Sequence, residues 1–154
     1  MRLASGNSVR RGAVAVEAAI VLPVFLLIVL GMIDLALAVM SQNALSEAAR
    51  DGSRQAVVHG ELAPSGWKGG PWGPTPIDEP GTATGIPAVA AVEPMLSVCP
   101  LDNTRVQVEW LTNSNKSGSP VRVTASGDYH PLVTYIFGSP SIRLSASSTM
   151  PIAH

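Results

Sequence analysis

The sequence is poor in cysteine and in charge. Cys99 is the single cysteine among 154 residues, so the chain forms no disulfide within itself and no cysteine-based zinc site. Charged residues make up 14% of the sequence, well below the roughly 25% of a typical soluble domain. Ten basic residues are balanced by eleven acidic ones, and the net charge of -1 supplies no basic surface for nucleic acid. We therefore expect no nucleic-acid partner.

Residues that carry catalysis or bind metals are scattered. The three histidines, His59, His130 and His154, stand alone without the spacing of metal ligands. No glycine-rich phosphate loop and no nucleophile motif occurs in the sequence. Since catalysis needs converging groups that no spacing here suggests, we expect a protein that is not an enzyme and that binds no metal and no cofactor.

An apolar run of 23 residues, from Ala18 to Met40, contains no Lys or Arg and a single acid, Asp34. A helix of that length spans about 34 Å, slightly more than the roughly 30 Å hydrocarbon core of a bilayer. A buried helix of a soluble protein would normally be shorter and would show a polar face. The run therefore predicts a membrane span at about residues 18–40.

The charges that flank this run predict its orientation. Arg2, Arg10 and Arg11 precede it, and no acid occurs among the first sixteen residues. By the positive-inside rule the N-terminus stays in the cytoplasm and the chain after Met40 is exported. A cleavable signal peptide is the alternative, since residues 36–38 fit its cleavage site, but the run is longer than the usual apolar core of roughly 7 to 15 residues.

Helix-forming residues continue beyond the apolar run to Val58, and Gly60 suits the position after a helix end. We expect one helix over residues 13–59. Its outer part carries a ridge of small residues at every fourth position, namely Ala44, Ala48, Gly52 and Ala56. Small residues let another backbone approach closely. The ridge packs either against the chain's own sheet or against another subunit.

Residues 60–87 differ sharply in composition, with thirteen Gly or Pro among twenty-eight residues. That share exceeds the roughly 25 to 30% above which a packed fold becomes improbable. We expect a long exposed loop or a partly disordered linker. Trp67 and Trp72 in this segment either pin the loop to its own domain or contact a partner or a glycan.

The remainder, residues 88–154, predicts an exported β-rich domain. Val106, Val108 and Trp110 alternate with polar residues, as in a half-buried strand. Residues 120–129 and 141–150 alternate in the same way, and residues 130–140 are either a crossover or a further strand. We expect a mainly antiparallel sheet of three or four strands, which the outer half of the long helix covers. Residues 86–98 add a short helix.

Two single residues raise open alternatives. An ionised Asp34 facing lipid is costly, so it either faces a partner, is protonated, or reaches toward the exported interface. Cys99, in an oxidising space, either links two molecules through a disulfide or is buried as an inert thiol beside apolar neighbours. Of the two, the sequence context VCPL favours burial.

Residues 10–54 carry an ordered set of motifs. The basic pair Arg10-Arg11 is followed by Gly12, a Val-Glu pair that ends at Glu17, a Leu-Pro pair early in the apolar run and a Gly-x-x-acid that ends at Asp34. The outer helix then holds the run AARDGSR at residues 48–54. In this order and spacing the segment resembles the TadE-like family, minor pseudopilins of the tight-adherence (Flp) pilus assembly system.

The resemblance implies that a prepilin peptidase cuts after Gly12. Ala13 then becomes the new N-terminus and Glu17 the fifth residue, whose carboxylate would pair with the free α-amine of a neighbouring subunit. From the residues alone, Glu17 is equally an acid of the first helical turn, which the helix dipole favours. An uncut chain tethered by its helix is the other alternative.

Together these expectations describe an α+β, pilin-like fold, with residues 1–12 as a cytoplasmic basic leader. The resemblance implies a non-enzymatic, single-pass component of the bacterial plasma (inner) membrane that serves a pilus or a related secretion assembly. Its partners would be the lipid bilayer, other pilin or pseudopilin subunits, the pilus assembly machinery and the prepilin peptidase. The alternative is a membrane-tethered or secreted binding module that holds a ligand in the loop of Trp67 and Trp72.

Overall fold

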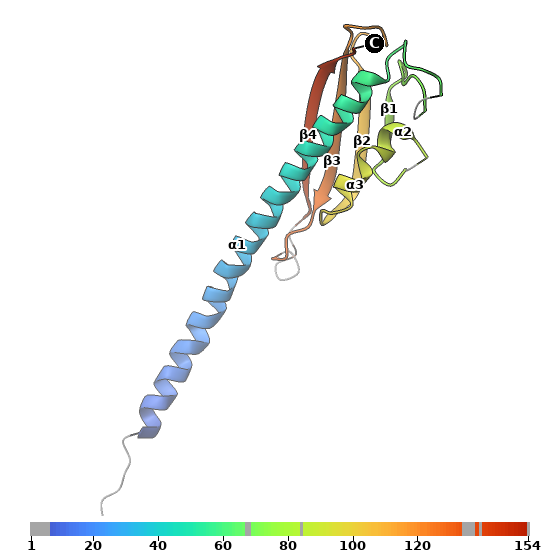
Figure 1. Cartoon of the computed structure of the whole chain (residues 1–154). Helices are drawn as coiled ribbons and strands as arrows, with labels where there is room; N and C mark the ends of the chain where they lie inside the picture. Colours follow the sequence, from blue (N-terminus) through green and yellow to red (C-terminus); the bar gives the residue numbers. More distant parts are fainter. Residues whose placement is uncertain (1–6, 67–68, 84, 134–137, 139, 154) are drawn as a thin grey trace, which may run out of the picture.

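A long helix and a four-stranded antiparallel sheet make up the molecule. The computed structural model describes residues 7–66, 69–83, 85–133, 138 and 140–153. Helix α1 (Asn7–Val58) comes first and is followed by four strands and two short helices (Figure 1). The expectation of an α+β, pilin-like fold is confirmed.

The two halves of helix α1 lie in different surroundings. Its 52 residues correspond to a length of about 78 Å. The N-terminal half stands clear of the rest of the molecule, whereas the C-terminal half lies along the sheet (Figure 1). The helix begins at Asn7, six residues before the expected start at residue 13. Pro23 lies within it.

The sheet has the order β1-β2-β3-β4, and every neighbouring pair is antiparallel. Its long strands are β2 (Leu101–Trp110), β3 (Pro120–Tyr129) and β4 (Ile142–Pro151). The alternation in β2 has the expected effect, because the buried residues Val106, Val108 and Trp110 pair with Ala125, Val123 and Val121 of β3. Polar residues between them face away from the helix.

Strand β1 (Ile77–Pro80) corrects the expectation of a continuous loop over residues 60–87. It pairs with β2, so that Ile77 lies opposite Val108. The Asp78 carboxylate accepts hydrogen bonds from Gln107 Nε2 at 3.1 Å and from Arg105 Nε at 3.0 Å. These contacts, with Gln107 the larger cause, lower the pKa of Asp78. The run of Gly and Pro hid a strand only four residues long, and Pro80 is tolerated at its end on the sheet edge.

The core lies between the sheet and the outer half of α1. Two short helices, α2 (Pro87–Ala90) and α3 (Glu93–Leu96), flank this layer on the side of α1 (Figure 1). The expected helix over residues 86–98 is thus split, and a proline stands in the first turn of each piece, where a missing N–H costs nothing. Buried apolar residues come from all of these elements: Leu45, Ala48, Ala49, Val89, Val92, Leu96, Val106, Val108, Val121, Val123 and Ala125.

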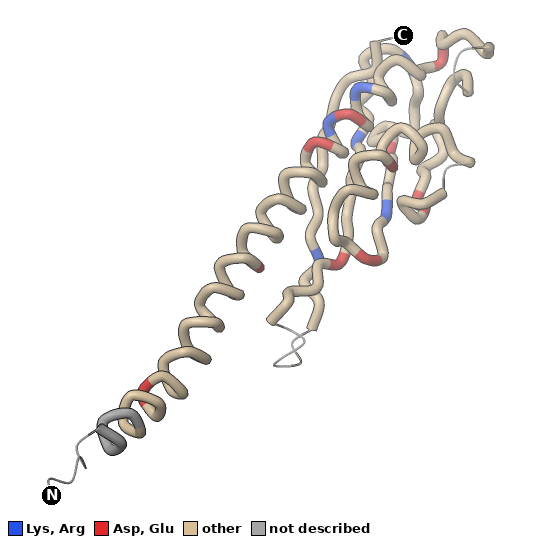
Figure 2. Tube along the Cα trace, turned by 60° about the horizontal axis from the view of Figure 1, so that its bottom comes forward, with Lys and Arg blue, Asp and Glu red and all other residues tan. Residues whose placement is uncertain are grey.

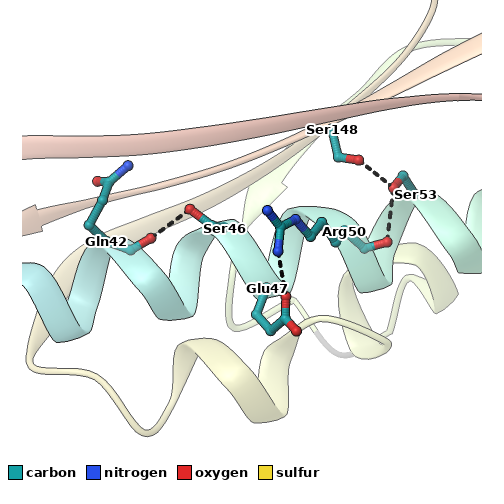
Figure 3. Close-up of polar contacts among 6 residues, drawn as sticks. All are labelled: Gln42, Ser46, Glu47, Arg50, Ser53 and Ser148. Carbon is teal, nitrogen blue, oxygen red and sulfur yellow. Dashed lines mark hydrogen bonds and ion pairs between the residues drawn. The ribbon is translucent and has the colours of Figure 1, made fainter.

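Polar contacts hold α1 against the edge strand β4 (Figure 3). The buried Ser53 hydroxyl bonds the Arg50 carbonyl oxygen at 2.9 Å and the Ser148 hydroxyl at 2.8 Å. Nearer the middle of α1 than Ser53, Gln42 Nε2 donates to the Ser145 carbonyl oxygen at 3.0 Å. These bonds fix where along β4 the helix lies.

Candidate assembly surface

The free half of α1 presents an apolar surface to its surroundings. In the described part of the chain, α1 is the one helix long and apolar enough to cross a membrane, and none of its most apolar window is buried. Charged residues are sparse along this half (Figure 2). Exposed large apolar side chains follow one another along it: Val14, Val16, Ile20, Val21, Leu22, Val24, Phe25, Leu26, Leu27, Ile28, Met32, Ile33, Leu35, Val39 and Met40. Such a surface is covered by lipid or by other helices.

The expected processing residues lie at the free end of this surface. Gly12, Ala13 and Glu17 are all exposed and helical. A Cβ added at Gly12 would meet no atom within 4 Å. Because α1 continues through Gly12 to Asn7, a peptidase acting there must unwind the helix locally. Glycine eases that step, since it favours the helix less than other residues except proline.

Asp34 contacts the chain's own loop after β3. Only 8% of Asp34 is exposed. Its carboxylate accepts hydrogen bonds from the backbone N–H of Leu132 at 2.6 Å and of Val133 at 2.9 Å. The Tyr129 hydroxyl lies 3.3 Å from Oδ1 of Asp34 and 3.1 Å from its backbone carbonyl oxygen. We call this set of four residues the Asp34 contact.

The Asp34 contact gives the carboxylate a partner that the sequence did not indicate. A partner on another subunit was one expectation, and the structure instead supplies three donors from the same chain. Burial raises the pKa of Tyr129, and the charge of Asp34 adds to that effect. The nearest sequence signal is the Tyr129-His130-Pro131 turn at the end of a strand, but nothing links it to a residue 95 positions earlier.

The small-residue ridge on α1 packs within the molecule. Ala48 and Ala56 are 0% and 1% exposed, and Gly52 is buried. A Cβ at Gly52 would lie 2.9 Å from side-chain atoms of both Val123 and Val92. In the structure these three residues pack against the chain's own domain, which is one of the two expected alternatives.

Ala44, the first residue of the ridge, is half-buried and borders a groove. This groove has a volume of about 300 Å³ and lies between α1 and α3, with Met40, Ala44, Glu47, Pro94, Met95, Val98 and Cys99 as its lining. Cys99 is 9% exposed, and burial raises the pKa of its thiol. The environment of Cys99 supports the inert thiol over the intermolecular disulfide.

Trp72 belongs to the domain core. It is 7% exposed and stacks on the ring of His59, with ring centroids 4.0 Å apart and planes at 12°. His59 itself is bonded through Nδ1 to the Gln55 carbonyl oxygen at 2.7 Å. Trp72 thus pins its segment to the end of α1. Trp67 and His154 lie outside the described residues.

Groups that could hold a metal do not come together in the ranges that the structure describes. His130 Nε2 lies 3.5 Å from the Asp102 carboxylate, and both side chains are substantially exposed. Such a pair adds little to stability.

A long apolar helix that stands free at one end and carries a small antiparallel sheet at the other defines a pilin-like fold. Residues 12–54 match the family described as TadE-like protein, so the predicted resemblance to this family is confirmed. The match covers most of the free half of α1, Asp34 and the first three residues of the small-residue ridge, Ala44, Ala48 and Gly52. Neither curated proteins nor solved structures give a match to the chain. The family and the candidate membrane helix support a membrane protein related to pilus assembly.

Proposed function

We propose that the chain is a non-enzymatic minor pseudopilin, a single-pass membrane subunit of a tight-adherence pilus or a related secretion assembly. The observation that carries this proposal is the exposed apolar half of α1, joined without a break to the sheet domain. Within a bilayer, such a helix associates with other helices through close packing. The match of residues 12–54 to TadE-like proteins supports pilin-like subunits as those partners.

In this proposal the N-terminus is cytoplasmic and the sheet domain lies on the exported side of the plasma membrane. Arg10 and Arg11 support that orientation through the positive-inside rule. A prepilin peptidase removes residues 1–12 and leaves Ala13 with a free α-amine. The exposed Glu17 carboxylate then pairs with the α-amine of a neighbouring subunit.

The Asp34 contact supports a membrane span nearer the N-terminus than residues 18–40. If Asp34 lay inside the hydrocarbon, the backbone of residues 130–133 and the Tyr129 hydroxyl would lie there too. Non-helical backbone in contact with lipid is not tolerated at that depth. Residues 12–33 form 22 helical residues and span about 33 Å, which suffices for the hydrocarbon core. Glu17 then lies about 7 Å inside the cytoplasmic boundary, so its need for a cationic partner is greater.

The mass of the intact protein, extracted by detergent from cells that contain a prepilin peptidase, tests the processing step. We expect the mass of a chain that starts at Ala13. Gly12→Val should block the cut and leave residues 1–12 attached, because the peptidase must bring its own backbone close to that position. A soluble product that starts at Val39 would contradict the whole proposal, because it would lack the span.

Co-purification with other pilin-like subunits tests the assembly role. Glu17→Gln should insert into the membrane as the original chain does but recover fewer partner subunits, since it removes the carboxylate charge. Glu47→Gln is the matched control, because its exposed side chain pairs with Arg50 on the same helix. Equal recovery of partners with Glu17→Gln and Glu47→Gln would count against the assembly role of Glu17.

A further inference from the structure

The sheet register brings the ends of three strands together, at the end of the domain nearest the free half of α1. Leu101 of β2 pairs with Tyr129 of β3, and Tyr129 pairs with Ile142 of β4. Leu132 follows Tyr129 by three residues. Figure 1 shows this end of the sheet beside the point where α1 leaves the domain. We call Leu132 and Ile142 the base of the domain.

The base exposes apolar side chains. Ile142 is 51% exposed and Leu132 41%. Two pairs of polar side chains lie near them, His130 with Asp102 at 3.5 Å and Arg143 with Asp128 at 3.6 Å. Apolar side chains next to paired polar groups resemble the face of a protein that lies at the boundary between lipid headgroups and acyl chains.

The Asp34 contact sets the height of the base along α1. Leu132 donates its backbone N–H to Asp34, and Tyr129, the register neighbour of Ile142, bonds the same carboxylate. Residues 12–33 already fill the roughly 30 Å of hydrocarbon, so Asp34 lies where the helix leaves the acyl chains. The base therefore lies at the boundary between the lipid headgroups and the acyl chains.

We propose that the base rests in the interface of the exported leaflet, with Leu132 and Ile142 inserted among the upper acyl carbons. This inference rests on the proposed function, because it requires α1 to span the bilayer. The domain then has two attachments to the membrane, the helix and the base. The lipid contact covers apolar side chains that water would otherwise meet.

Site-specific fluorescence of the full chain in vesicles of phosphatidylcholine and phosphatidylglycerol tests the proposal. In a Cys99→Ala background, single cysteines replace Leu132, Ile142, Leu62 or Ile28 and carry a small fluorescent label. The backbone N–H of residue 132 keeps its bond to Asp34 in this variant. Leu62 is the matched control, because it is 77% exposed and lies beyond the opposite end of α1.

Vesicles with a quencher attached to the upper acyl carbons should reduce the fluorescence at positions 132 and 142 and leave position 62 unchanged. Aqueous iodide should reduce the fluorescence at position 62 and leave positions 132 and 142 unchanged. Iodide access at 132 and 142 equal to that at 62 would overturn the inference. Protection of 132 and 142 from both quenchers would also overturn it, since a protein partner would then cover the base. A label at Ile28 that no lipid quencher reaches would instead contradict the membrane span itself.

Discussion

The Asp34 carboxylate accepts hydrogen bonds from three donors, which all come from the C-terminal end of β3 and the turn that follows it. Asp34→Ala should lower the free energy of unfolding of the sheet domain by about 1 to 3 kcal/mol, because two backbone N–H groups lose a charged acceptor. Asp34→Asn should cost less, since its amide oxygen still accepts. Urea unfolding of the detergent-solubilised chain measures both, with Glu47→Gln as the exposed control.

Tyr129→Phe tests the same contact from the other side. It should cost about 1 kcal/mol, the usual contribution of a single hydrogen bond. Because the two residues touch, the double variant Asp34→Ala with Tyr129→Phe should cost less than the sum of the single changes. Strict additivity in the same urea unfolding measurement would show that the two residues do not interact.

Gly52 marks the closest approach of α1 to the sheet. Gly52→Ala brings a methyl group to 2.9 Å from Val123 and Val92, which are 1% and 0% exposed and have no room to move. The expected loss is about 1 to 3 kcal/mol in the free energy of unfolding, as for other overpacked cores. Gly31→Ala is the matched control on the same helix, because nothing lies within 4 Å of its added methyl group. Equal thermal stability of the two variants would contradict this packing.

Among the elements, β1 depends most on polar bonds. The lowered pKa of Asp78 means that the folded chain favours the charged carboxylate, so its contribution is present above pH 3.8 and is lost as the pH falls through the lowered value. Asp78→Asn should therefore reduce the fall in melting temperature between neutral pH and about pH 3, a range set by ordinary carboxyl values. An unchanged fall in the variant would show that the Asp78 bonds add nothing to β1.

The sequence predicts elements well where a periodic pattern is long. Strands β2, β3 and β4 each have ten residues, and α1 has a long apolar run, so all four were expected. Strand β1 is too short for a period to show, and it depends on pairing with β2, which local composition does not report. The Asp34 contact joins residues about 95 positions apart, so no local pattern could indicate it. The ridge of small residues at Ala48 is visible in the sequence, but the sequence does not tell whether it packs against the chain's own sheet or against another subunit.

At the scale of the whole molecule, Asp34 separates the exposed apolar part of α1 from the part that packs on the sheet. A fragment of residues 34–154 lacks most of the apolar surface but keeps every residue of the Asp34 contact. It should remain soluble without detergent and unfold in one cooperative transition, followed by circular dichroism. A fragment that starts at Val39 should unfold at a lower temperature, because Leu132 and Val133 lose their acceptor. Identical melting temperatures would contradict this role.

The continuity of α1 has a mechanical consequence. From Ile33 to Val58 the helix extends about 37 Å outward, and the bonds of Gln42 and Ser53 to β4 leave no joint along that length. Tilting the helix by 10° would thus carry the far end of the sheet sideways by about 6 Å, as a lever does. In the proposed membrane orientation, the Asp34 contact supports the helix where it leaves the bilayer. A neighbour that changes the tilt of the free half of α1 would then move the sheet domain with it as one rigid body.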